Sequence, residues 1–183
     1  MPITPYTGTF GRPELLHLLR RSLFGVSPTD MAHFDGMGLQ EVVSELLTFT
    51  TATEPPLKTW FGDAGNGADP SLVDPTVAFG ATWVDTPINP AEAIDPSSYR
   101  NYSFMRWWVG NMVGQERNLR EKMTLYWSNH LVTQVFAVFT PDAMYRYNQY
   151  LRDHCLGNFR QMMYDVTVHP AMLLYLNGFL NVN

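Results

Sequence analysis

The stretch LREKMTLYWSNHLVTQ, from Leu119 to Gln134, decides the fold class of this chain. Its apolar residues recur every three or four positions, which is the period of an α-helix that packs one face against a core. Asn118 and Glu121 stand at the spacing of a capping box, with Asn118 as the N-cap residue. The stretch therefore predicts a core helix that starts here and runs to about Gln134.

His130 is the polar residue of this helix with the clearest chemical potential. At about 100° per residue, it falls within a sector of about 120° that is otherwise mainly apolar, so it is predicted to be buried. The imidazole is then either a neutral, hydrogen-bonded part of the core or a general base or metal ligand at the mouth of a pocket. Buried polar groups are normally paired, which favours the first alternative. The sector holds Leu119, Met123, Trp127, His130, Leu131 and Gln134.

A second helix is predicted to carry polar residues to the same interior. Thr140-Pro141-Asp142 has the residue types of a helix start, and Gly157 those of a helix end. Counting around this helix places Asn148 on the inward face and His154 at its margin. His130 and Asn148 are therefore expected to point into a shared interior. The inward face is predicted to hold Met144, Tyr147, Asn148, Leu151 and Cys155.

The remaining helical patterns make the fold class all-α, a multi-helix array without strands or internal repeats. Apolar periodicity and capping residues predict helices over 12–24, 28–36, 39–47, 98–114, 158–168 and 171–175. The helix over 98–114 carries one apolar stripe, and such a stripe is more often core than a ligand site. The stripe comprises Tyr102, Met105, Trp108, Val109 and Met112.

Residues 50–98 differ from the rest, because they are rich in proline and glycine and show no sustained period of either 3.6 or 2. They are predicted to form a long irregular insertion over the helices. Its apolar residues argue against full disorder, since low hydrophobicity is what keeps a segment unfolded. The predicted anchors are Trp60, Phe61, Phe79, Trp83 and Ile88.

No cofactor and no metal site is predicted. His130, His154 and His169 lie on different elements, and no H-x-x-x-H or H-x-x-E-H spacing occurs. Cys155 is the only cysteine, which excludes an intramolecular disulfide and a cysteine-rich zinc site; it is expected to be buried and inert. The chain also lacks a Gly-rich phosphate loop, a nucleophile elbow and a paired-carboxylate motif.

Composition narrows the classes of partner. The net charge is −5 and the basic residues are dispersed, so no nucleic-acid partner is expected. No apolar run approaches the roughly 20 residues of a membrane span, and the first residues do not have the pattern of a signal peptide. Charged residues make up only 16% and aromatic residues 14%, which predicts apolar surface that contacts a protein partner, a second copy or a further part of the polypeptide.

Four segments together carry a family resemblance. They are HLLRRSLFGVSP (His17 to Pro28), LREKMTLYWSNH (Leu119 to His130), MYRYNQYLRDHCLGNFRQMM (Met144 to Met163) and HPAMLLYLNG (His169 to Gly178). In order and spacing they resemble the bacterial family catalogued as domain of unknown function 1800. The resemblance implies a mostly helical protein considerably longer than this chain, so residues 1–183 are expected to be a helical N-terminal portion of a longer protein.

The resemblance also implies a location and bears on the metal question. Many members of the family look exported, which implies a role in the cell envelope. The family's tryptophan motif has a histidine in the position of Ser128, so one potential ligand is missing here. The resemblance implies no reaction, because none is established for the family.

Two functions follow as hypotheses. The first is a binding or assembly role, in which apolar surface docks a partner or the remaining C-terminal part of the protein. The alternative is a hydrolase or oxidoreductase whose site uses His130 and is completed by that C-terminal part. In this alternative Asn129, Asn148 and Arg120 orient the reacting groups.

Overall fold

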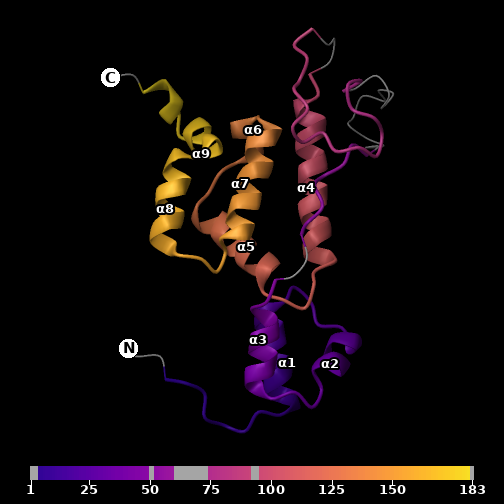
Figure 1. The fold of residues 1–183 in the computed structure, drawn as a ribbon, viewed down its shortest axis with the longest axis vertical. Helices are drawn as coiled ribbons and strands as arrows, with labels where there is room; N and C mark the ends of the chain where they lie inside the picture. The colour runs from indigo at the N-terminus through magenta and orange to yellow at the C-terminus, as the bar shows by residue number, and fades with distance from the viewer. Residues whose placement is uncertain (1–3, 50–51, 60–73, 92–94, 182–183) are drawn as a thin grey trace.

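The structure is a computed structural model that describes residues 4–49, 52–59, 74–91 and 95–181. These residues form nine α-helices and one 3-10 helix, with no strand among them, so the all-α prediction is confirmed. Figure 1 shows two groups of helices stacked along the long axis. The N-terminal cluster comprises α1 to α3, and the body comprises α4 to α9.

The N-terminal cluster consists of α1 (Arg12–Ser22), α2 (Pro28–Phe34) and α3 (Leu39–Leu46) around a small apolar core. Local signals set the start of α2, because Ser27 accepts a hydrogen bond from the Asp30 backbone N–H at 3.1 Å and Pro28 occupies the first turn. The three helices share the buried residues Leu15, Leu19, Leu23, Met31, Phe34, Val42 and Leu46.

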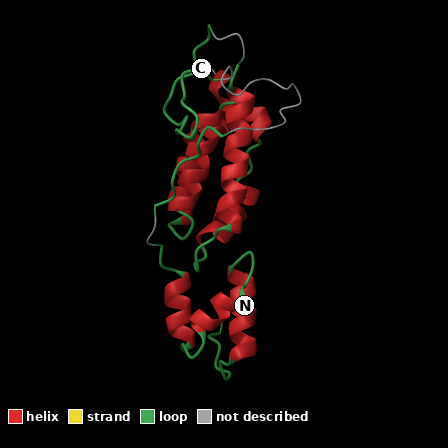
Figure 2. Ribbon diagram, turned by 90° about the vertical axis from the view of Figure 1, so that its right-hand side faces the viewer, coloured by secondary structure: helices red, strands yellow, loops and turns green. Residues whose placement is uncertain are grey.

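The body is organised around one central helix, α7, which packs against α4, α5, α6 and α9. Figure 2 shows the long helices of the body running side by side along the long axis. The predicted inward face of α7 is confirmed, since all five of its residues are buried. The elements of the body are α4 (Ser97–Val113), α5 (Arg120–His130), α6 (Val135–Val138), α7 (Pro141–Asp153), α8 (Phe159–Val168), α9 (Pro170–Tyr175) and the 3-10 helix η1 (Gly178–Leu180).

The helix predicted to run to Gln134 ends at His130. The Leu131 N–H still bonds to the Trp127 carbonyl oxygen at 2.7 Å, and the chain then leaves the helix. Val132 and Thr133 are β-branched and therefore weak helix formers, which explains a break that apolar periodicity alone does not show. His130 is consequently the last residue of α5.

Between α3 and α4 the described residues have no regular structure, as predicted, apart from an isolated bridge between Leu57 and Thr82. Trp83 is a confirmed anchor: it is buried and its indole N–H donates to Ser103 Oγ at 3.0 Å. Phe79 was predicted to be an anchor and is instead 67% exposed. Ile88 is half-buried, and Trp60 and Phe61 lie outside the described residues.

Two polar contacts hold the ends of this irregular region together. Arg100, on α4, forms a buried two-pronged pair with Asp74, in which both N···O distances are 2.7 Å. Lys58 donates through Nζ to the carbonyl oxygens of Asp74 and Val77 at 2.8 and 2.9 Å. Lys58 and Asp74 therefore lie next to each other beside α4.

The N-terminal cluster and the body are joined by polar contacts. The Leu119 N–H donates to the Leu46 carbonyl oxygen at 2.8 Å, and Arg117 Nε donates to Asp30 Oδ1 at 2.9 Å. Burial raises the pKa of Asp30, but hydrogen bonds from Ser27 and from Arg117 outweigh it, so the pKa lies below its ordinary value. Among the described residues, the buried apolar cores of the N-terminal cluster and of the body are separate.

Candidate functional site

Helix α4 has an inverted arrangement of polar and apolar residues. Its buried side includes the polar residues Arg100, Asn101 and Ser103 together with Phe104. Its outer side, here called the α4 face, is apolar and exposed. Most of the predicted apolar stripe is therefore surface, although the pattern suggested core. The α4 face comprises Tyr102 (44% exposed), Met105 (39%), Val109 (57%) and Val113 (83%).

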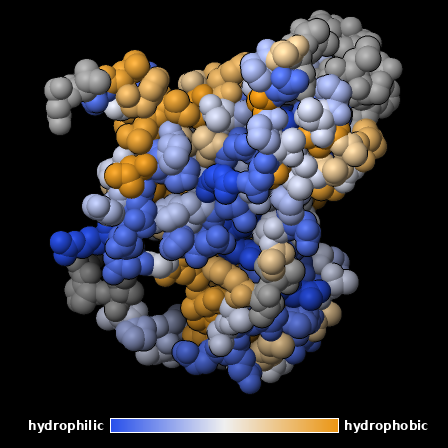
Figure 3. Space-filling model, turned by 45° about the horizontal axis from the view of Figure 1, so that its top comes forward, coloured by the Kyte–Doolittle hydropathy of each residue, from blue (hydrophilic) through white to orange (hydrophobic). Residues whose placement is uncertain are grey.

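A second exposed apolar surface lies near the C-terminal end of the described chain. Figure 3 shows apolar side chains gathered there, over α9 and η1. Leu176, Phe179 and Leu180 are all more than half exposed. The surplus of apolar residues in the composition is thus found on the surface in at least two places, as expected for a chain with an apolar contact surface.

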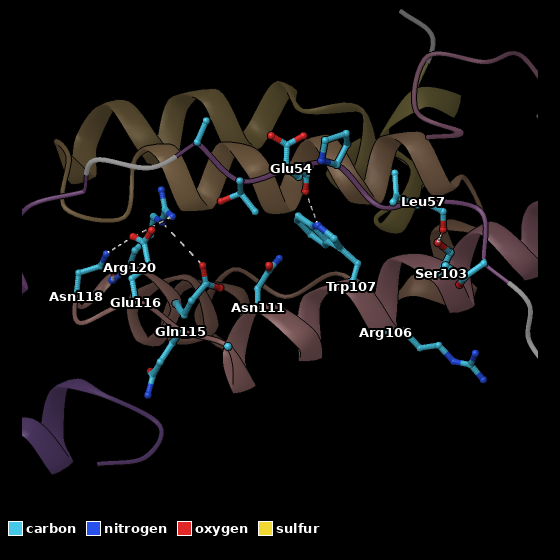
Figure 4. A pocket seen from close by; sticks show the side chains of 16 residues that line it. Glu54, Leu57, Ser103, Arg106, Trp107, Asn111, Gln115, Glu116, Asn118 and Arg120 are labelled. Carbon is cyan, nitrogen blue, oxygen red and sulfur yellow. Dashed lines mark hydrogen bonds and ion pairs between the residues drawn. The ribbon is translucent and has the colours of Figure 1, made fainter. Parts of the chain in front are cut away.

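A groove of about 550 Å³ lies beside the α4 face, between α4, the start of α5 and residues 52–59, here called the strap (Figure 4). Side chains of α4 hold the strap by its backbone. Trp107 Nε1 donates to the Glu54 carbonyl oxygen at 2.6 Å, and Ser103 Oγ donates to the Leu57 carbonyl oxygen at 2.7 Å. The strap therefore keeps its place without regular secondary structure.

The floor of the groove contains a buried ion pair between helices. Glu121 on α5 contacts Arg152 on α7, and their side chains are 6% and 1% exposed. Arg152 also donates to Asn148 Oδ1 at 3.2 Å, and Arg120 Nε lies 3.9 Å from Glu121 Oε1. The guanidinium of Arg152 lies 5.0 Å from the centre of the Trp107 ring, so the network reaches the wall of the groove.

Burial dominates the electrostatics of this pair. Desolvation raises the pKa of the Glu121 carboxyl, although Arg152 and Arg120 oppose the shift. Desolvation likewise lowers the pKa of Arg152, although Glu121 opposes that shift.

The start of α5 differs from the predicted capping box. The N-cap residue is Leu119 and not the predicted Asn118. The Asn118 side chain, from one position earlier, accepts from the Arg120 N–H at 3.1 Å, and the Glu121 side chain contacts Arg152.

The four residues predicted for an enzyme site fall in two separate places. Arg120 and Asn148 both belong to the network beneath the groove. His130 and Asn129 are exposed at the far end of α5, about 15 Å along the helix from Arg120. The predicted burial of His130 is therefore wrong, and its ring is stacked on Tyr126 with centroids 6.1 Å apart.

The burial of His130 was predicted wrongly because α5, like α4, turns polar residues toward the interior. The fully buried residues of α5 are Glu121 and Thr124, whose hydroxyl donates to the Arg120 carbonyl oxygen at 2.8 Å. A count of apolar residues therefore selects the wrong face. The signal that was missed is a set of complementary polar residues on two neighbouring helices. Helix α5 carries the acid Glu121, and α7 carries the amide Asn148 and the base Arg152 four residues apart.

A second cavity, of about 570 Å³, lies beside α7, and its lining includes two histidines as well as Pro55 of the strap, which also lines the groove. His154 Nδ1 lies 2.9 Å from the Tyr150 carbonyl oxygen, and His169 Nδ1 accepts from the Ala171 N–H at 3.2 Å. Burial lowers the pKa of His169, which favours its neutral form. Within the described residues no group of three or more histidine, cysteine or acidic side chains could hold a metal ion.

Comparison with known proteins identifies the family. Among the described residues, none of the helices has the length and apolar character needed to cross a membrane. Searches of curated proteins and of solved structures found no significant match. The family described as "Protein of unknown function (DUF1800)" matches residues 17–183, which is most of the chain and includes α2 to α9. The chain therefore belongs to the DUF1800 family.

Proposed function

We propose that this domain has a binding or assembly role and that the α4 face is its docking surface. One observation carries the proposal: α4 buries Arg100, Asn101 and Ser103 and exposes four apolar side chains on one side, with the exposed Arg106 at their edge. Burying polar groups and exposing apolar ones both cost free energy in an isolated domain. Covering the α4 face with another apolar surface removes the second cost.

The geometry of the α4 face suits a helical partner surface. Its residues follow one another at spacings of three and four along the helix, as do the anchors of helices that pack into grooves. Phe136 extends the face, because its ring lies 5.5 Å from that of Tyr102. We propose that the occupant is an apolar helical surface from the C-terminal part of a longer polypeptide, as the family resemblance implies.

The proposal is tested by substituting Val109 with lysine. A charge in the middle of the face is expected to reduce binding of a hydrophobic dye. It should also weaken any association seen by light scattering by about tenfold or more. Because Val109 is exposed, the free energy of unfolding should change by no more than about 0.5 kcal/mol.

Val168→Lys is the matched control, since Val168 is also an exposed valine on a helix, at 58% against 57% for Val109. If the two substitutions reduced dye binding and association equally, the α4 face would not be the docking surface. A wild-type protein that is monomeric and binds no dye would contradict the docking role.

A second candidate is the enzyme alternative built on His130, and one observation supports it: the imidazole is exposed and so is accessible to a substrate. We propose that in this case a further part of the polypeptide supplies the remaining groups. Nuclear magnetic resonance of the His130 ring, with and without that part, tests the idea. An unchanged ring environment would contradict it.

A further inference from the structure

Within the described part of the chain, three polar atoms that line the groove have no hydrogen-bond partner, and they come from three different elements. Thr53 Oγ1 belongs to the strap, Asn111 Nδ2 to α4 and Glu121 Oε2 to α5. All three are shielded from solvent. An unpaired polar group in such a position costs about 1–3 kcal/mol, and native proteins have few of them. The groove therefore offers three polar atoms that a guest could pair with.

The three atoms together specify the chemistry of that guest. An ionised Glu121 oxygen only accepts, the Asn111 amide nitrogen only donates, and the Thr53 hydroxyl does both. A simple anion offers no donor to Glu121, and a simple cation offers no acceptor to Asn111. A hydroxyl group both donates and accepts, so several hydroxyls on one small molecule satisfy all three.

The charges around the groove favour a neutral guest. Glu121 already contacts Arg152, and Glu116 lies 3.8 Å from Arg120 and accepts from the Asn118 amide at 2.8 Å. The two other charged residues of the lining, Glu54 and Arg106, have opposite signs. No excess of either charge remains to select an ion.

Trp107 adds an apolar surface to the same site. Figure 4 shows Trp107 and Asn111 pointing from α4 toward the strap. Arg152 and Tyr145 both pack against the indole, so a guest contacts only the part of the ring that lines the groove. The volume of about 550 Å³ lies within the roughly 300–1,000 Å³ typical of small-molecule sites. We infer that the groove binds a small, neutral, polyhydroxylated ligand of the sugar type.

The inference is tested by nuclear magnetic resonance on the ¹⁵N-labelled chain, with D-glucose and N-acetyl-D-glucosamine as probes. The side-chain amide signals of Asn111 are assigned by their absence in Asn111→Leu, and the indole N–H signal of Trp107 by its absence in Trp107→Phe. At least one sugar is expected to shift both sets of signals in a saturable way. If neither sugar does so up to its solubility, bound water is the guest and the inference is wrong.

Two variants separate binding from folding. Asn111→Leu and Thr53→Val each remove one unpaired polar group, so the melting temperature should stay the same or rise. Each should nevertheless weaken sugar binding by about tenfold, measured through the Trp107 signal. A lower melting temperature with unchanged affinity would show that the groups are structural and would overturn the inference.

Gln149→Leu is the matched control. Gln149 Oε1 is also shielded and without a hydrogen-bond partner, but it lines the second cavity beside α7. This substitution should leave sugar affinity unchanged. An equal loss in Gln149→Leu and Asn111→Leu would place the sugar outside the groove. The result does not depend on the α4 face, so the docking role and the sugar site can fail separately.

Discussion

The N-terminal cluster and the body bury different kinds of side chain. The core of the cluster, from Leu15 to Leu46, is formed by apolar residues. The interior of the body also contains Arg100, Asn101, Glu121, Asn148 and Arg152. A buried ion pair adds little net stability compared with apolar residues of the same size. Stability alone therefore explains the cluster, whereas Glu121, Asn148 and Arg152 are better explained by the groove above them, and Arg100 by its pair with Asp74.

The largest effect is expected from Arg152→Ala, which leaves the Glu121 carboxyl buried without its main cation. Breaking such a pair costs about 3–5 kcal/mol of unfolding free energy. The measurement is chemical denaturation followed by circular dichroism. The double variant Glu121→Met, Arg152→Met is the control, and it should recover much of the loss because two apolar residues need no partner. A cost below about 1 kcal/mol for Arg152→Ala would contradict the difference between the two interiors.

A loss of unfolding free energy of similar size is expected from Leu19→Ala in the N-terminal cluster, where only apolar packing is removed. Leu19 is fully buried, and its truncation should cost about 2–5 kcal/mol through lost burial and a cavity. All five tryptophans follow residue 59, so tryptophan fluorescence reports on the chain outside the N-terminal cluster. Circular dichroism reports on all helices, including those of the cluster. Because polar contacts join the two parts, the circular dichroism signal should change at lower denaturant than the fluorescence. Coincident transitions would show that cluster and body unfold together.

The smallest effect is expected at the junction, from Asp30→Asn. The pKa of Asp30 is lower in the folded state than its unfolded value of about 3.9. The charged carboxylate therefore stabilises the fold above that value, and this contribution is lost as the pH falls through the lower folded pKa. The substitution should cost less than about 1 kcal/mol at neutral pH, and the difference from wild type should close in acid.

Asp35→Asn controls for the loss of one negative charge, since Asp35 lies nearby with its side chain 65% exposed. Denaturation curves across the acid range measure both variants. A difference between Asp30→Asn and wild type that does not depend on pH would show that the carboxylate charge is not what joins cluster and body.

Helix positions were predictable from the sequence, because capping residues and periodic apolar residues are local signals. Ser27-Pro28 marks the start of α2, and Thr140-Pro141 that of α7. Residues that face the interior were predictable only where apolar residues do the packing, as on α7. On α4 and α5 the interior side holds Arg100 and Glu121, whose partners are distant in the sequence.

The candidate site was predictable only in part. Arg120 and Asn148 were selected for their position near a predicted interior, and both lie in the network under the groove. His130 was selected by the same count and lies at an exposed helix end. The groove itself was not predictable, because its wall is the strap, a segment without periodicity that is held by backbone hydrogen bonds. The proposed roles of Arg120, Asn129, His130 and Asn148 in catalysis remain predictions.

The contacts of Lys58 have a practical consequence for engineering. Its ammonium donates to the carbonyl oxygens of Asp74 and Val77 and so joins residues on the two sides of positions 59 to 74. Doubling the length of a flexible loop costs only about 0.6 kcal/mol. A fluorescent protein or an affinity tag inserted between residues 59 and 74 should therefore leave the helices and the groove intact.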